Sequence, residues 1–218
     1  MNPIYRAGWI AFRFVYRFYF GWNVYNAERV PLTGPVILAS NHCSILDPPL
    51  VGAGIRRDIN YLARESLFRF PVVGWVLRNW NSVPVDREGG GARGLKAILD
   101  RLLKGGAIIV FPEGTRSKDG HLQPARSGIG LTVIKSTAPV VPVRVFGTFQ
   151  AYGRDMPIPL PFHRVQVKYG KSMIFEELRA EAKTCSKERL KQIYQQIANE
   201  LMAVISKLEP CEDRESFP

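Results

Sequence analysis

Short apolar runs alternate with helical patterns along most of the chain, and this alternation restricts the fold more than any other feature. Turn residues bound each run, which is typical of strands that are buried or half-buried in a sheet. The runs lie at residues 36–39, 59–63, 83–85, 107–111, 140–146 and 165–169. Helical periodicity between them is clearest at residues 95–103, and Gly105-Gly106 ends it. The alternation predicts an α/β fold, a single domain with a mostly parallel central sheet flanked by helices.

One domain accounts for the length and the apolar content of the chain. With 218 residues, of which 46% are hydrophobic, the sequence can build one substantial core. Apolar residues recur at helical spacing from Leu190 to Leu208, which predicts a packed amphipathic helix near the C-terminus. We expect a main domain at residues 29–208 and a flexible tail at residues 209–218.

The N-terminal segment is dense in aromatic residues, carries three arginines and has no acidic residue before Glu28. A helix that spans a bilayer needs roughly 18 or more nearly uncharged residues, and the arginines interrupt this stretch well below that length. The apolar centre of a signal peptide would also have to contain Arg13 or Arg17. We therefore expect residues 1–28 to form an amphipathic helical segment that lies on a membrane. The alternative is an N-terminal helix packed on its own domain.

The charge of the chain favours an anionic partner. It has 30 Lys and Arg against 19 Asp and Glu, a net charge of +11. Nucleic acid, an acidic membrane surface and phosphorylated substrates would all fit, but no nucleic-acid recognition motif is present, so we expect no nucleic acid partner. Cys43, Cys185 and Cys211 lack paired or metal-type spacing, so we expect no disulfide framework and no metal site. A reducing, cytosol-facing location is the simpler assumption.

Two polar clusters each follow a strand-like run directly. His42 and Asp47 stand five positions apart after the run 36–39, and the cluster 111–117 follows the run 107–110. Because functional loops gather at the carboxyl ends of parallel strands, we expect the two clusters to lie close together. A histidine with an acidic partner can act as a general base on a hydroxyl, and a loop with Gly, Thr and Arg can hold a phosphate. The pair predicts chemistry on an alcohol that carries an anionic group.

Both clusters also have simpler structural interpretations. Asp47 precedes Pro48, so it could be only the N-cap of a helix. Glu113 and Arg116 could form an ion pair in a polar loop. Cys43 beside His42 suggests a thiol nucleophile, but neighbouring residues in an extended loop point apart, which disfavours it.

Residues 89–94 match the G-x-G-x-x-G pattern of a dinucleotide site and precede a helical pattern. Asp86 and Glu88 lie between the preceding strand and these glycines. Two carboxylates there would repel a pyrophosphate, so we disfavour a dinucleotide site.

Four motifs, in this order, resemble the glycerolipid acyltransferase family with its H-x4-D motif, specifically the short bacterial 1-acylglycerol-3-phosphate acyltransferases. They are N-H-x-S-x-x-D at 41–47, V-D-R at 85–87, F-P-E-G-T-R-S at 111–117 and V-P-V at 141–143. The resemblance implies an enzyme that moves a fatty acyl group from acyl-CoA or acyl carrier protein to the free hydroxyl of lysophosphatidic acid, giving phosphatidic acid. It implies no cofactor beyond the acyl donor and no metal, because the thioester is already activated.

The resemblance also implies roles for individual residues. His42 would be the general base, and Asp47 would orient its imidazole and stabilise the imidazolium. Arg126 stands where the family often has lysine, so the positive charge is kept with a different geometry. The implied substrate-binding residues are Glu113, Gly114, Thr115, Arg116, Arg87 and Arg126. A different lysolipid acceptor, such as lyso-ornithine lipid, and a non-catalytic lipid-binding protein remain the alternatives.

These expectations together imply a location and a set of partners. We expect a peripheral or monotopic protein at the cytoplasmic face of the inner membrane, in contact with anionic lipids. Its other partners would be a lysophospholipid acceptor and acyl-CoA or acyl carrier protein. Residues 67–80 are apolar and aromatic, and Pro71 restricts any helix there to short pieces. They could line an acyl-chain groove, touch the membrane or belong to the core.

Overall fold

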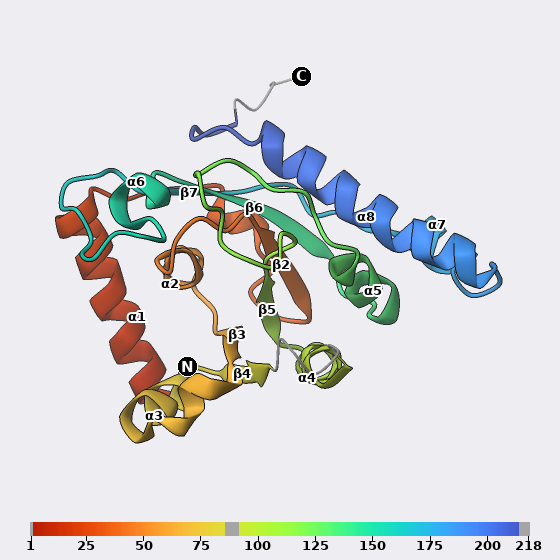
Figure 1. Ribbon diagram of the computed structural model, residues 1–218, viewed down its shortest axis with the longest axis horizontal. Coiled ribbons are helices and arrows are strands. Elements are labelled where there is room, and N and C mark those ends of the chain that lie inside the picture. The colour runs from red at the N-terminus through yellow and green to blue at the C-terminus, as the bar shows by residue number, and fades with distance from the viewer. Residues whose placement is uncertain (1, 86–91, 214–218) are drawn as a thin grey trace.

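A seven-stranded sheet forms the centre of the computed structural model, which describes residues 2–85 and 92–213 (Figure 1). The strand order is β1-β7-β6-β2-β5-β3-β4. The strands from β6 to β4 are parallel, β7 is antiparallel to β6, and β1 is parallel to β7. The predicted α/β fold with a mostly parallel central sheet is therefore confirmed. The strands are β1 (Asn23–Tyr25), β2 (Val36–Ser40), β3 (Ile59–Arg64), β4 (Ser82–Val85), β5 (Ala107–Val110), β6 (Val140–Phe146) and β7 (Gln166–Tyr169).

Helices cover both faces of the sheet, as Figure 1 shows. Along the central strand β2, Val36 and Leu38 belong to the core on one face, and Ile37 and Ala39 belong to the core on the other. This alternation follows from the pleat of a strand buried on both sides. The first face is covered by α1 (Pro3–Val15) and α2 (Asp47–Ala53), and the second by α4 (Ala92–Leu103), α5 (Gly128–Lys135) and α8 (Lys187–Lys207).

The remaining helical elements are short. Pro71 starts α3 at its first position, where a missing N–H costs no hydrogen bond, so the expected short helical pieces are confirmed in this segment. Its side chains Phe70, Val72 and Trp75 are exposed. Among residues 2–85 and 92–213, the short elements are a π-helix (Tyr16–Phe20), two 3₁₀ helices (Ala27–Arg29 and Glu65–Arg69), α3 (Pro71–Asn79), α6 (Thr148–Tyr152) and α7 (Glu176–Glu181).

The expected N-terminal helix is present, and its two sides differ. On the inner side, the Trp9 indole N–H donates to the carbonyl of Ile55 at 3.0 Å, and the Arg13 guanidinium donates to that of Ala53 at 2.6 Å. The outer side exposes Phe14 and other apolar residues. The segment therefore packs on its own domain and also presents aromatic rings to the outside. Within the described residues, no helix has both the length and the apolarity that a bilayer crossing requires.

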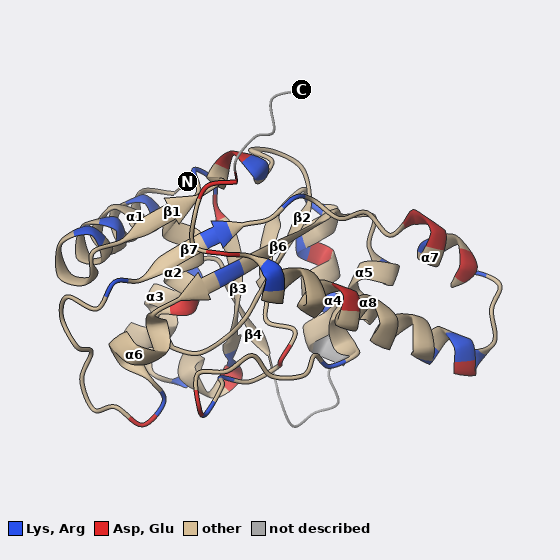
Figure 2. Cartoon of the chain, turned by 90° about the horizontal axis from the view of Figure 1, so that it is seen from above, with Lys and Arg blue, Asp and Glu red and all other residues tan. Residues whose placement is uncertain are grey.

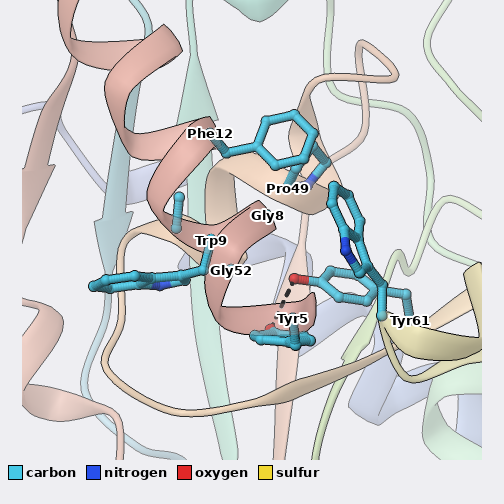
Figure 3. A pocket seen from close by; sticks show the side chains of 9 residues that line it. Tyr5, Gly8, Trp9, Phe12, Pro49, Gly52 and Tyr61 are labelled. Carbon is cyan, nitrogen blue, oxygen red and sulfur yellow. Dashed lines mark hydrogen bonds between the residues drawn. The ribbon is translucent and has the colours of Figure 1, made fainter. Parts of the chain in front are cut away.

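A small pocket lies where α1 meets α2 and the end of α3 (Figure 3). The Tyr5 and Tyr61 hydroxyls form a hydrogen bond at 3.2 Å, and the Phe12 ring meets the Trp80 indole edge-on with 5.0 Å between centroids. Gly8 lets the indole approach, because a Cβ at this position would collide with it. The pocket's volume is about 20 Å³, so the aromatic rings nearly fill it. Its lining residues are Tyr5, Gly8, Trp9, Phe12, Pro49, Gly52, Ala53, Tyr61 and Trp80.

The predicted C-terminal helix is present as α8, with Ser186 as its N-cap. The chain then returns toward the sheet, where the carboxylate of Asp213 forms ion pairs with Lys168 of β7 and with Arg29. Lys168 is almost fully buried, so this contact neutralises a charge that would otherwise be costly. The rest of the expected tail, residues 214–218, lies outside the described residues.

Candidate active site

The sheet brings the two polar clusters together at the carboxyl ends of β2 and β5. These strands are neighbours in the sheet, with Ala39 of β2 opposite Val110 of β5. The next residues of each strand lead into the two loops, and the backbone N–H of Ser117 donates to the carbonyl of His42 at 2.7 Å. The predicted proximity of the clusters is therefore what the structure shows.

His42 and Asp47 face each other within the first loop. The His42 Nδ1 atom lies 2.9 Å from Asp47 Oδ2, and the same oxygen accepts the backbone N–H groups of Cys43 at 2.6 Å and Ser44 at 2.7 Å. Because this oxygen already accepts from two amides, the contact with the imidazole is satisfied when Nδ1 carries the proton and donates it. Nε2 is then the basic nitrogen, and it can take a proton from a hydroxyl.

Asp47 does not have the N-cap role that its place before Pro48 suggested. The helix α2 already includes Asp47, and Leu46 occupies the cap position without a side-chain cap. The Asp47 side chain is fully buried and points back into the loop, because the turn at residues 43–46 aims two amides and the imidazole at one oxygen. Its other oxygen, Oδ1, has no hydrogen-bond partner in the described structure.

The ring of Phe111 fixes the orientation of the imidazole. It stacks on His42 with 3.9 Å between ring centroids and 16° between planes. The sequence interpretation did not single out Phe111. Its only signal was that it stands at the head of the 111–117 cluster, where β5 ends.

Glu113 supports the backbone of the first loop. Its side chain is 2% exposed; Oε1 accepts the backbone N–H of His42 at 2.9 Å, and Oε2 accepts that of Gln123 at 3.2 Å. Burial raises the pKa of Glu113 to about 7, although both amide donors act in the opposite direction. Both carboxylate oxygens thus accept backbone N–H groups inside the protein, so the structural position of Glu113 differs from the substrate-binding role that we expected. None of the ion pairs among the described residues joins Glu113 to Arg116, so the simpler ion-pair interpretation is wrong.

The rest of the second cluster forms a surface loop beside His42. Gly114 and Thr115 are exposed, and Arg116 is partly exposed. Gly114 adopts φ +71°, which favours glycine, and its Cα approaches the Arg126 side chain so closely that a Cβ would lie 3.1 Å from Cδ. The Arg126 N–H donates to the Pro112 carbonyl at 2.9 Å. The fold thus places Gly114, Thr115, Arg116 and Arg126 on or beside this loop, in addition to His42, Asp47 and Glu113, while Arg87 lies outside the described residues.

Two grooves flank this centre. One has a volume of about 530 Å³ and mostly apolar walls from α4 and α5, and its lining also includes Phe111, Gly114 and Arg126. The other, of about 550 Å³, is more polar and includes Cys43 and Arg144. The Nη1 atom of the Arg144 guanidinium donates to the backbone carbonyls of Ser206 and Leu208 at the end of α8, which holds this side chain against that helix.

Buried polar contacts hold the first loop in place. The Asn41 side chain exchanges two hydrogen bonds with the backbone of Val145, at 2.8 and 3.2 Å. The Ser44 hydroxyl donates to the Tyr152 carbonyl at 2.6 Å. Asn41 stands directly before His42, but nothing in the sequence shows that its partner lies 104 positions away.

Cys43 does not have the environment of a nucleophilic thiol. Burial raises its pKa to about 12, and the nearby Asp47 and Glu113 carboxylates act in the same direction. The thiol is therefore protonated at neutral pH, which agrees with the sequence argument against it. No group of three or more His, Cys, Asp or Glu residues that could hold a metal occurs in the part of the chain that the structure describes.

The fold and the site define an α/β protein with a His–Asp pair, of which the aspartate is buried, at the carboxyl edge of a mostly parallel sheet. A family model described as Acyltransferase matches residues 21–146, and the chain belongs to this family. A chloroplastic 1-acyl-sn-glycerol-3-phosphate acyltransferase, BAT2 of Brassica napus, is 33% identical over 147 residues, which are 66% of this chain and 41% of that protein.

Bacterial relatives and a solved structure agree with this assignment. The 1-acyl-sn-glycerol-3-phosphate acyltransferase of Bacillus subtilis (strain 168) is 31% identical over 128 residues, 58% of this chain and 63% of that protein. The crystal structure of the 1-acyl-sn-glycerophosphate (LPA) acyltransferase PlsC from Thermotoga maritima superimposes with a TM-score of 0.68 at 25% identity, over 95% of this chain and 80% of that chain. The matches span about 41% of the Brassica protein and 63% of the Bacillus protein.

Proposed function

We propose that the protein is an O-acyltransferase that moves a fatty acyl group from a thioester donor, acyl-CoA or acyl carrier protein, to the free hydroxyl of lysophosphatidic acid. The observation that carries the proposal is the 2.9 Å contact between His42 Nδ1 and Asp47 Oδ2 at the carboxyl edge of the sheet. The names of the Brassica, Bacillus and Thermotoga relatives support this choice of reaction.

The proposed reaction needs one proton transfer in each direction. Nε2 of His42 takes the proton of the acceptor hydroxyl while the oxygen attacks the thioester carbonyl, and Asp47 stabilises the imidazolium that forms. The tetrahedral intermediate collapses by breaking the carbon–sulfur bond, and the imidazolium returns the proton to the thiolate. The products are the acylated lipid and the free thiol of the donor. Because the thioester is already activated, the reaction requires neither a cofactor nor a metal.

The surface loop beside His42 supplies the proposed site for the acceptor's phosphate. Arg116 has no hydrogen bond or ion pair among the described residues, so its guanidinium is available for an oxyanion. Arg126 lines the apolar groove, next to Gly114. A phosphate held between Arg116 and Arg126 would leave the glycerol hydroxyl free to reach His42. Thr115 is exposed on the same loop and can add a hydroxyl donor.

A membrane surface is the proposed place of the reaction, since both substrate and product are lipids. The N-terminal segment presents exposed Phe14 and Phe18 together with Arg17. Aromatic rings and arginines in one segment are typical of contact with an anionic headgroup region. We propose a peripheral or monotopic attachment through this segment, at the cytoplasmic face of the inner membrane.

Purified protein, radiolabelled acyl-CoA and a panel of lysolipids test the function directly. The proposal expects labelled phosphatidic acid from lysophosphatidic acid, and expects His42→Ala to reduce the rate to background while the circular dichroism spectrum stays unchanged. His121→Ala, which removes an exposed histidine outside the proposed machinery, is the matched control. A labelled ornithine lipid instead would change the acceptor but keep the reaction, whereas bound lipid without any thioester release would indicate a non-catalytic protein.

A further inference from the structure

Three exposed apolar side chains occur in the loop between α6 and β7, residues 153–165, which we call the α6–β7 loop. Ile158 is 66% exposed, Leu160 36% and Phe162 83%. Phe162 has a positive φ of 62°, a conformation that an aromatic residue rarely adopts. The ring of Phe162 is almost fully exposed, and its backbone conformation is unfavourable. Packing within the chain explains neither property.

Hydrogen bonds fix this loop beside the N-terminal segment. The backbone N–H of Phe162 donates to the carbonyl of Tyr19 at 2.7 Å, and the Tyr19 hydroxyl donates to the carbonyl of Pro159 at 3.0 Å. A third bond, from the Leu160 N–H to the Ala151 carbonyl at 2.8 Å, ties the loop to α6. The position of the apolar side chains is therefore set by the fold.

The α6–β7 loop extends the apolar outer side of the N-terminal segment. Phe14 is 63% exposed and Phe18 65%, and their rings lie 4.5 Å apart between centroids. In Figure 1 the loop, in cyan, lies next to the C-terminal end of α1. Two segments some 140 residues apart in sequence thus form one exposed apolar edge.

Basic residues accompany this edge. Arg17 on the N-terminal segment and Arg154 and Arg164 on the α6–β7 loop are exposed, with Asp155 as the acidic residue of that loop. Figure 2 shows Lys and Arg, and no Asp or Glu, along α1. Apolar rings flanked by arginines fit an anionic phospholipid bilayer, because the rings can enter its hydrocarbon region while the arginines contact its anionic headgroups.

We propose that the α6–β7 loop enters the headgroup region of an anionic bilayer beside the N-terminal segment, with Phe162 as its main apolar contact. This inference rests on the proposed function for its choice of a phospholipid surface. The loop is also connected to the candidate active site, because the Ser44 hydroxyl donates to the carbonyl of Tyr152, the last residue of α6. Membrane contact here would bring the His42 loop to the bilayer, so a lysolipid could reach it without passing through water.

Co-sedimentation with vesicles of phosphatidylglycerol and phosphatidylcholine tests the loop without an acyl donor. Phe162→Ser is expected to lower the partition coefficient about tenfold, since burial of a phenyl ring in an apolar phase contributes at least that factor. The matched control is Leu103→Ser on α4, which removes a side chain that is 85% exposed on the opposite face of the sheet. Equal partition coefficients for Phe162→Ser and wild type, or equal losses in both variants, would overturn the proposal.

A second variant guards against a local folding defect in Phe162→Ser. Phe162→Trp keeps an aromatic ring, and its added fluorescence is expected to be quenched by vesicles with brominated acyl chains; an unquenched signal contradicts insertion.

Turnover of a monomeric short-chain lysophosphatidic acid by Phe162→Ser is expected to equal that of wild type. Loss of this turnover would assign Phe162 to the fold or the active site instead. A wild-type protein that binds vesicles but shows no turnover would refute the proposed function and leave the membrane loop supported.

Discussion

The imidazole of His42 and the phenyl ring of Phe111 are parallel to within 16°, with 3.9 Å between their centroids. His42 lies near the start of the loop after β2 and Phe111 directly follows β5, so the stack joins two segments that only the sheet brings together. Asp47 binds the same imidazole at Nδ1, and Glu113 accepts the backbone N–H of His42. Two contacts thus restrain the ring and a third restrains the backbone that carries it, which gives Nε2 a defined orientation, as an efficient proton transfer requires.

Replacement of Phe111 by leucine tests the contribution of the stack. Leucine keeps most of the apolar volume but provides no flat surface, so the imidazole gains rotational freedom. We expect kcat to fall about tenfold, a typical cost of a less well oriented base, with KM for the acyl donor little changed. Steady-state kinetics would measure kcat and KM separately. An unchanged kcat with a raised KM would instead make Phe111 a substrate-binding residue.

Asp47→Asn separates catalysis from stability. The amide oxygen can still accept the N–H groups of Cys43 and Ser44, so we expect the urea midpoint of unfolding to change little. The charge that stabilises the imidazolium is lost, and kcat is expected to fall by about 10²- to 10⁴-fold. Asp155→Asn, at an exposed position, should retain full activity. A strong loss of stability with near-normal kcat would show that Asp47 is a structural residue only.

Glu113 should make stability depend on pH. Its pKa is about 7 in the folded protein against an ordinary value of 4.5, so between these values the unfolded state releases the proton first. The contribution of Glu113 to stability is therefore fully present below about pH 4.5 and is lost as pH rises through 7. Urea unfolding of wild type and Glu113→Gln at several pH values measures this, because the difference between them cancels the other titrating groups. A difference that stays constant from pH 4.5 to 8 would contradict the raised pKa.

Cys43 should be dispensable for acyl transfer. Because burial raises its pKa to about 12, the thiol is protonated and shielded at neutral pH. We expect Cys43→Ala to keep activity within about threefold, the range of a modest packing change near a site. Mass spectrometry after iodoacetamide treatment of native protein should find label on the exposed Cys211 and none on Cys43. Loss of activity on specific alkylation of Cys43 would reopen a thiol mechanism.

Strands of the main sheet could be predicted because each is a local pattern. The runs at 36–39, 107–111 and 140–146 correspond to β2, β5 and β6 within one residue at each end. The strand β1 was not expected, since its three half-buried residues have no clear alternation and form a strand only by pairing with β7. The π-helix that continues α1 was not expected either. Packing against the rest of the domain decides which of its aromatic side chains are buried and which are exposed.

The candidate site divides in the same way. His42 and Asp47 could be paired from the sequence because five positions and one turn separate them. Glu113 was expected among the substrate-binding residues, but in the structure its carboxylate accepts the backbone N–H of His42, 71 positions away in sequence. Sequence alone shows that an acid follows β5; whether that acid faces solvent or the loop beside it depends on how the two strands are aligned.

The sequence by itself determined the α/β class, the places of the parallel strands and the spacing of the His42–Asp47 pair, because each depends on residues close together along the chain. The tertiary structure alone decided that Phe111 stacks on the imidazole, that Glu113 binds the backbone of His42, and that the loop around Phe162 lies beside Tyr19. Such contacts arise only when distant segments pack. The register of the sheet and the burial of its two faces determine which distant segments come into contact, and no short stretch of residues specifies either.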